Sequence, residues 1–212
     1  MSVVNTSRQE KAAATRRRMV EAAYSLFCES GYRATTMAAI AERAGVAVQT
    51  LYFTFHTKDE LLQEVHKRAV LGDDPRPPSQ QDWFVEVMAE RNAQRAISMA
   101  VEATAVILAR VAPMLPVFHA VAADAAGVVF RRGEEHRRRG MRELAELILG
   151  KAGTSGSISA DAAADLFYVL LGPENYRSFV LDLGWPPEAW IRWTTNALVH
   201  DLCGTRDQAR RS

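Results

Sequence analysis

The sequence of 212 residues predicts an all-α fold. Apolar residues recur at helical spacing, and no stretch of any length alternates between apolar and polar residues as a strand does. Glycine and proline residues punctuate these stretches, which divides the chain into separate helices. We therefore expect three short N-terminal helices followed by a larger helical body, since 212 residues exceed one small module.

The first helix is expected over Thr15–Ser30. Its apolar stripe consists of Val20, Ala23, Tyr24 and Phe27, which are spaced i, i+3, i+4, i+7, and it stops at Gly31.

Two short helices around a tight turn are predicted between Thr35 and Lys58. Ala41 provides the small side chain needed where two helices nearly touch, and Gly45 tolerates the left-handed backbone of the turn. Thr35 and Thr36 can cap the first of these helices and leave N–H groups for a phosphate. The second, about Val48 to Phe53, is short enough to enter a major groove about 12 Å wide. The pattern predicts a helix-turn-helix, although close helix packing alone also produces Ala-x-x-x-Gly.

A third signal follows at Thr57-Lys58-Asp59-Glu60. A threonine followed three residues later by glutamate is a capping box, which starts the next helix and places Lys58 in its first turn. Met37 could offer apolar contact to a base.

The run from Arg17 to Leu62 resembles the DNA-binding domain of the TetR family of transcriptional regulators. The matching motifs are Gly-Tyr-x-x-Thr-Thr, Ile-Ala-x-x-Ala-Gly-Val and Leu-Tyr-x-x-Phe, with a lysine near the next helix start. The resemblance implies that Thr36, Tyr52 and Lys58 contact phosphates. It also places Gln49, Thr50, Phe53 and Thr54 in or beside the recognition helix, and the DNA-binding set is completed by Ala47 at the helix start. The alternatives are that Tyr52 belongs to the core and that Thr36 is merely a cap.

Two positions depart from the family pattern. Ala47 replaces a common capping serine, and Thr54 stands where histidine or tyrosine is frequent. Some phosphate contacts of the family therefore do not carry over directly, although His56 could substitute.

Basic residues concentrate beside this segment. Residues 1–70 contain ten Lys or Arg against seven Asp or Glu, and the first twenty residues carry five cations against Glu10. This basic N-terminal arm can follow a DNA backbone or enter the minor groove, and a solvated, frayed terminus is the alternative.

A proline-rich stretch from Gly72 to Ser79 ends the helix that starts at Lys58. We therefore expect a DNA-binding domain over residues 1–57, a connecting helix and hinge over 58–80, and a regulatory domain over 81–212. In the last, helices are expected over Asp82–Val111, about Asp124–Gly150, from Ser159, and over Pro187–Leu202. The arginine-rich run Arg131–Arg142 contains interleaved glutamates, which indicates a solvated helix face.

Met and aromatic side chains of the regulatory domain could line a cavity for an apolar ligand. The family resemblance implies such a pocket, and the candidate residues are Trp83, Met88, Met99, Glu102, Phe118 and Phe130. Ordinary core packing is the alternative for the apolar residues, and Glu102 could equally face solvent.

The last two large helices also resemble those of the TetR family, which build a homodimer. Trp190, Trp193, Ala197 and the segment 199–202 offer apolar surface for a four-helix interface, or for the core of one chain. A dimer would place two recognition helices to bind a pseudo-palindromic double-stranded DNA operator.

We expect a DNA-binding transcriptional regulator, a repressor released by a small apolar or amphipathic effector, with a regulator that has no such ligand as the alternative. No catalytic constellation, cofactor motif or metal motif is recognised, so we expect neither an enzyme nor a cofactor or metal site. No leader segment and no uninterrupted apolar run of about eighteen residues is present, which predicts a cytoplasmic protein without a membrane partner.

Overall fold

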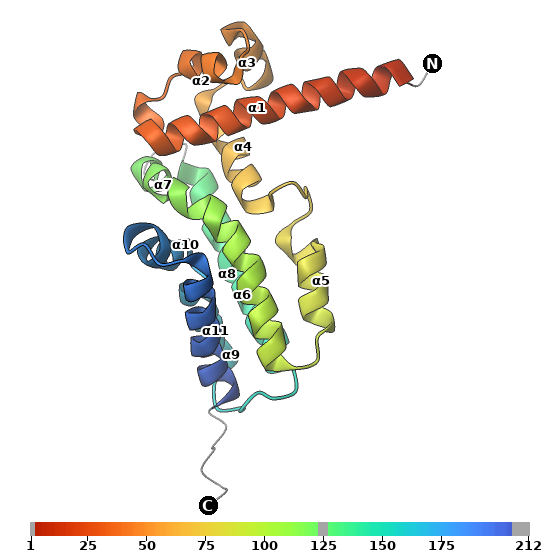
Figure 1. The fold of residues 1–212 in the computed structure, drawn as a ribbon, viewed down its shortest axis with the longest axis vertical. Coiled ribbons are helices and arrows are strands. Elements are labelled where there is room, and N and C mark those ends of the chain that lie inside the picture. Colours follow the sequence, from red (N-terminus) through yellow and green to blue (C-terminus); the bar gives the residue numbers. More distant parts are fainter. Residues whose placement is uncertain (1–2, 123–126, 205–212) are drawn as a thin grey trace, which may run out of the picture. The chain divides into compact units, whose positions relative to one another are not determined.

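The computed structural model describes the backbone of residues 3–122 and 127–204, and its helices are shown in Figure 1. These described ranges contain helices and loops without a strand, which confirms the all-α prediction.

The chain divides into two compact units, each made of separate stretches of sequence. Unit 1 comprises residues 1–69 and 114–131, and unit 2 comprises residues 70–113 and 132–212. Unit 1 contains α1 (Val3–Ala34), α2 (Met37–Ala44), α3 (Val48–Thr54), most of α4 (Lys58–Leu71), α7 (Leu115–Val121) and the start of α8 (Gly127–Leu149). Unit 2 contains η1 (Pro78–Gln80), α5 (Asp82–Ala89), α6 (Ala93–Val111), the rest of α8, α9 (Ala160–Leu170), α10 (Pro173–Tyr176), the π-helical segment η3 (Arg177–Asp182) and α11 (Pro187–Cys203). The short η2 (Ala112–Met114) lies at the boundary.

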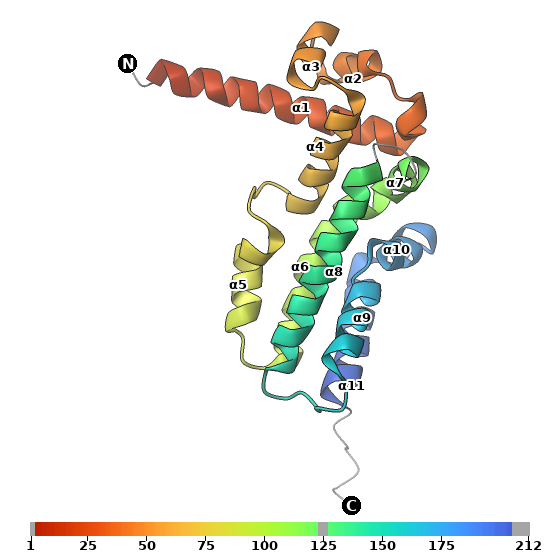
Figure 2. The ribbon, with the colours of Figure 1, turned by 180° about the vertical axis from the view of Figure 1, so that it is seen from behind.

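Unit 1 is built around α1. The helices α2 and α3 lie on one side of α1 and α7 on the other (Figures 1 and 2). Its core combines residues from both stretches of sequence, including Phe27, Leu51, Val65 and Phe118. The domain boundaries predicted at residues 57 and 80 divide the chain into consecutive stretches, whereas each compact unit combines two separate stretches. The functional roles of the three predicted segments stay predictions.

The first helix begins earlier than predicted, at Val3 instead of Thr15. Its regular backbone breaks at Gly31, where φ is 79° and ψ is 165°. This left-handed φ strains any residue with a side chain, so glycine permits the sharp change of direction before α2.

Unit 2 has α6 at its centre, with α5 on one side and α11 on the other (Figure 1). The facing surfaces of α6 and α11 are apolar, and Ile97, Val101, Trp190 and Leu198 are fully buried. Each such side chain contributes about 1.5–3 kcal/mol of transfer free energy to folding.

The helix predicted over Asp82–Val111 is two helices. The chain leaves helical geometry at Glu90, and the side chain of Asn92 then caps α6 by accepting a hydrogen bond from the Arg95 N–H at 3.0 Å. An asparagine cap of this kind favours a new helix start over continuation of the previous one.

The proline-rich connector has a defined conformation. The amide Nε2 of the buried Gln81 lies 3.0–3.4 Å from three backbone carbonyl oxygens, those of Leu71, Asp74 and Arg76, and Gln81 Oε1 accepts from the Trp83 indole at 3.1 Å. Gln81 therefore joins the end of α4 to the start of α5 through its side chain.

One helical stretch, Ala93–Val121, is long and apolar enough to cross a membrane by length and composition. Of its most apolar window, 56% is buried inside the protein. A core helix passes the same test, so this stretch is weak evidence for a membrane span.

Candidate nucleic-acid interface

The turn between α2 and α3 has the geometry expected of a helix-turn-helix. The Thr36 side chain caps α2 by accepting from the Ala39 N–H at 3.1 Å. Gly45 ends α2 with φ 66°, and the N–H groups of Gly45 and Val46 donate to the carbonyls of Glu42 and Ala41. This paired bonding satisfies the last carbonyl groups of the helix and fixes the direction of α3.

The predicted recognition helix, α3, packs against the core of unit 1 through one apolar face. Leu51 and Phe55 are buried in the core of unit 1. The opposite face carries Gln49, Thr50, Tyr52 and Phe53, all of which are exposed. Two of these are large aromatic residues, with Tyr52 49% exposed and Phe53 86% exposed. Because Tyr52 and Phe53 are adjacent, their rings expose apolar surface together, which is a feature of interaction surfaces.

The residues at the starts of α2 and α3 differ in their burial and in their hydrogen bonds. Ala47 is exposed and precedes α3 without a side-chain cap bond, as its methyl group requires. Thr35 is buried, and its hydroxyl lies 2.8 Å from the Gly31 carbonyl oxygen and 3.1 Å from that of Leu26. Met37 is buried as well, so its suggested contact with a base is wrong: the side chain packs in the core of unit 1.

Lys58 has a structural role that its motif did not indicate. Its ammonium donates to the backbone carbonyl oxygens of Tyr32 at 2.8 Å and Thr35 at 2.9 Å, and lies 4.3 Å from the centroid of the Tyr32 ring. Burial lowers the pKa of Lys58 from its ordinary value, and the Asp59 carboxylate opposes that shift. The first turn of α4 is therefore tied to the segment between α1 and α2.

The capping box at Thr57 forms with one difference. The Thr57 hydroxyl accepts from the Glu60 N–H at 3.0 Å, as predicted. The Glu60 carboxylate accepts from the N–H of His56 at 3.1 Å, one residue before the expected donor. His56 is also within 3.1 Å of this carboxylate through Nδ1, so its ring is held at the start of α4.

The basic N-terminal residues lie on a helix rather than on an irregular arm. Arg16 pairs with Glu64 at 3.2 Å and lies over the Phe55 ring at 4.3 Å, and Arg18 donates to the Ala44 carbonyl at 3.4 Å. Arg8 and Lys11 are exposed on the same helix. Contact between these residues and DNA stays a prediction.

The six candidate ligand residues are divided between the two units. Phe118 is buried in the core of unit 1, and its ring stacks on Phe130 with centroids 5.3 Å apart. The other four belong to unit 2: Trp83 and Met99 are partly buried against its core, Met88 is 50% exposed, and Glu102 is exposed and accepts from Ser98 at 2.9 Å.

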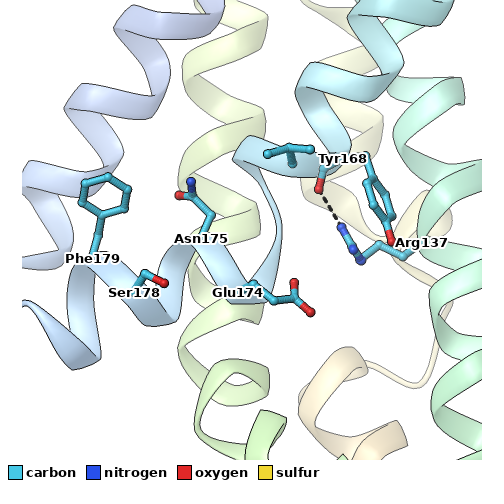
Figure 3. Close-up of a pocket in the computed structure, with 7 residues that line it drawn as sticks. Arg137, Tyr168, Glu174, Asn175, Ser178 and Phe179 are labelled. Atoms are coloured by element: carbon cyan, nitrogen blue, oxygen red, sulfur yellow. Dashed lines mark hydrogen bonds between the residues drawn. The ribbon is translucent and has the colours of Figure 1, made fainter. Parts of the chain in front are cut away.

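A hollow of about 470 Å³ in unit 2 contains none of those six residues. It is lined by Arg137, Tyr168, Val169, Glu174, Asn175, Ser178 and Phe179 (Figure 3). Arg137 donates to the Tyr168 carbonyl at 2.8 Å and to the Glu134 carboxylate at 2.7 Å, and Tyr168 donates to the same carboxylate. Burial and the bond to Glu134 raise the pKa of the Tyr168 hydroxyl. Sequence reasoning missed this hollow because it joins residues from α8, α9, α10 and η3.

Several arginines of the run Arg131–Arg142 interact with the protein itself. Besides Arg137, Arg138 lies 4.3 Å from the Tyr168 ring centroid, and Arg142 pairs with Asp161 at 2.5 Å. Arg132 and Arg139 are exposed, in keeping with a solvated helix face.

The fold and the α2–α3 geometry define a helix-turn-helix DNA-binding protein. Residues 19–65 match the model of a family described as bacterial regulatory proteins, tetR family. The segment that contains the helix-turn-helix is therefore that of the TetR family of transcriptional regulators.

Solved structures with a similar fold extend over most of the chain. A transcriptional regulator assigned to this family from Mesorhizobium loti MAFF303099 is 20% identical with a TM-score of 0.66, over 90% of this chain and 98% of that one. NalD, the secondary repressor of the MexAB-OprM multidrug efflux pump in Pseudomonas aeruginosa, is 20% identical with a TM-score of 0.64, over 92% and 99%. A regulator from Saccharomonospora viridis in complex with choline is 14% identical with a TM-score of 0.68, over 90% and 98%. No curated protein sequence matches the chain.

Proposed function

We propose that the protein is a homodimeric repressor that binds a pseudo-palindromic operator in double-stranded DNA and leaves it when a small apolar or amphipathic molecule binds. The main observation that supports this proposal is the pair of exposed aromatic rings, Tyr52 and Phe53, on a helix whose other face packs in the core. These rings and their polar neighbours form a surface suited to a DNA groove.

The exposed side chains divide into base-contacting and phosphate-contacting groups. Gln49 can pair with the donor and acceptor of an adenine edge, while Phe53 offers an apolar surface to a thymine methyl group. Tyr52, Thr50 and Thr36 carry hydroxyl groups that can donate to phosphate oxygens. Lys58 contributes positive charge near the start of α4, although two of its three N–H donors already serve backbone carbonyls.

The dimer is proposed to form through α9 and α11. Trp190 and Leu198 are fully buried and belong to the core of unit 2, so they do not contribute to an interface. Val169 of α9 is 59% exposed and Trp193 of α11 is 37% exposed, so both can pack against a second copy. Two copies would place two α3 helices to bind the half-sites of one operator.

Release by an effector is proposed to act through α4. In the first turn of α4, the Lys58 ammonium donates to the Tyr32 carbonyl of α1. In its last turn, the Leu71 carbonyl accepts from the side-chain amide of Gln81 in unit 2. A molecule that binds unit 2 and shifts this end of α4 would change the population of DNA-competent dimers. The choline complex of the Saccharomonospora viridis regulator supports small-molecule binding by a body of this fold.

A DNA-binding regulator without an effector is the alternative. It is favoured by the division of the six candidate ligand residues between two units. Such a regulator would bind the same operator, and no small molecule would change its affinity.

The test is a gel shift with duplex DNA flanking the protein's own gene. The Tyr52→Ala variant should bind at least tenfold more weakly, while Val106→Ala, which removes an apolar side chain exposed on α6, should bind as the wild type does. Equal binding by all three proteins would refute the interface. Repeating the assay with candidate small molecules, choline among them, distinguishes the effector-controlled repressor from the alternative.

A further inference from the structure

A hollow of about 480 Å³ lies between the N-terminal half of α1 and the recognition helix. It is lined by Lys11, Ala12, Ala13, Thr15, Arg16 and Met19 of α1 and by Thr50 and Thr54 of α3. We propose that this hollow receives a phosphate group of the DNA backbone and that Lys11 supplies the charge that holds it. This inference rests on the proposed DNA binding and adds a contact from α1 to it.

Several of the residues that line the hollow, on α1 and on α3, have short side chains. Ala12 and Ala13 carry only methyl groups, and Thr50 and Thr54, four residues apart, lie one above the other on α3. These threonines belong to the same seven-residue helix as the exposed Tyr52 and Phe53. A DNA strand that borders the groove occupied by α3 would therefore pass close to this opening.

Thr54 cannot serve as the phosphate donor in this arrangement. Its hydroxyl donates to the carbonyl oxygen of Thr50 at 2.9 Å, and a hydroxyl has a single proton to donate. A phosphate beside this turn can still accept from the Thr50 hydroxyl, but α3 carries no charged side chain, so the positive charge must come from another element.

Two cations line the hollow, and their surroundings differ. Arg16 is held over Phe55 and paired with Glu64, so much of its charge is already compensated. Lys11 is exposed and has neither an ion pair nor a hydrogen bond to any residue that the structure describes. Its three N–H donors and full charge are thus available to a phosphate, as in other lysine–phosphate contacts.

A basic track extends from this hollow along α1. Arg8 precedes Lys11 by three residues, and Thr15 follows by four, so the three side chains share one helix face. Because α1 begins at Val3, Arg8 and Lys11 lie on a regular helix instead of an irregular arm.

The experiment compares Lys11→Ala with Lys67→Ala, which removes an exposed lysine of α4 outside the hollow. The probe is a duplex selected by the wild-type protein from a random double-stranded DNA library, with affinity measured over a series of KCl concentrations. Lys11→Ala should reduce the slope of log affinity against log salt by about 0.9 for each bound protomer. It should also weaken binding about tenfold at about 0.1 M salt, for the selected duplex and a scrambled duplex alike.

The remaining outcomes are equally specific. Lys11→Arg should retain most of the affinity, and Lys67→Ala should match the wild type in both slope and affinity. An unchanged slope for Lys11→Ala, or equal losses in Lys11→Ala and Lys67→Ala, would overturn the phosphate site while leaving DNA binding intact. Failure of the wild type to select any duplex would overturn the proposed function as well. Thermal unfolding of each variant checks that the fold is retained.

Discussion

The ammonium of Lys58 donates a hydrogen bond of 2.9 Å to the carbonyl oxygen of Thr35. Thr35 directly precedes the cap of α2, and Lys58 is in the first turn of α4. This bond therefore joins the beginning of the helix-turn-helix to the helix that follows it.

Replacing Lys58 should affect stability as well as DNA binding. Lys58→Met retains the apolar stem but leaves the carbonyls of Tyr32 and Thr35 without this donor, so we expect a loss of about 1–3 kcal/mol in the free energy of unfolding. Urea denaturation measures this loss. Lys67→Met, at an exposed position of the same helix, should change stability by less than about 0.5 kcal/mol. Equal stability of the two variants would show that the Lys58 bonds contribute nothing to the fold.

A charge at the proposed dimer surface should separate the two copies. Trp193 is partly exposed beside Phe179 and Trp185, with ring centroids 4.8 Å and 6.5 Å away. Trp193→Glu should therefore convert the dimer into a monomer in sedimentation experiments, because a carboxylate is costly in an apolar interface. The control is Val85→Glu, which changes an exposed residue of α5. If the Trp193 variant sediments as the wild type does, this surface is not the interface.

Unit 2 buries a threonine hydroxyl that has no hydrogen-bond partner among the described residues. Thr194 is fully buried, and its Oγ1 has no hydrogen-bond partner within the described part of the chain. An unsatisfied buried hydroxyl costs about 1–3 kcal/mol, so Thr194→Val, which keeps the shape, should raise the free energy of unfolding by about 1 kcal/mol. The opposite change, Thr194→Ser, keeps the hydroxyl and deletes a methyl group, and it should destabilise. Chemical denaturation that ranks valine below threonine would contradict this interpretation.

The pair between Arg43 and Glu29 should add a pH dependence to stability. The guanidinium donates two hydrogen bonds of 3.1 Å to the carboxylate and holds the pKa of Glu29 below its ordinary value of 4.5. A carboxyl group whose pKa is lower in the folded state stabilises the fold at pH values above its pKa in the unfolded state. This contribution is lost as the pH falls through the pKa of the folded state. Both groups are exposed, so the effect should be small.

Thermal unfolding of the wild type and Glu29→Gln between about pH 6 and about pH 3 tests that expectation. The wild type should be slightly more stable near neutrality, and the difference should disappear at the acid end. A difference that is constant across this range would show that the pair does not titrate with folding.

Local signals predicted the helix-turn-helix well. Gly45, the cap at Thr36 and the capping box at Thr57 act within a few residues of themselves, so their geometry is visible in the sequence. The apolar residues Ile40 and Leu51, which flank this turn, are buried in the core of unit 1.

Features that depend on distant residues were not predicted. Lys58 bonds to carbonyls 23 and 26 residues away, and the hollow beside α3 requires Lys11 of α1 to lie next to Thr54. Phe118 of α7 is a similar case: an aromatic residue suits either a ligand pocket or a core, and Phe118 packs in the core of unit 1.

The discontinuous makeup of unit 1 has a consequence for engineering hybrid regulators. An exchange of DNA-binding modules that cuts after residue 69 would leave behind Met114, Val117, Phe118 and Val121, which belong to the core of that unit. The transplanted piece would then expose the apolar surface that these four side chains cover, and it would be prone to aggregate. A hybrid that changes operator preference while remaining well folded should carry both stretches, 1–69 and 114–131, or exchange surface residues of α3 alone.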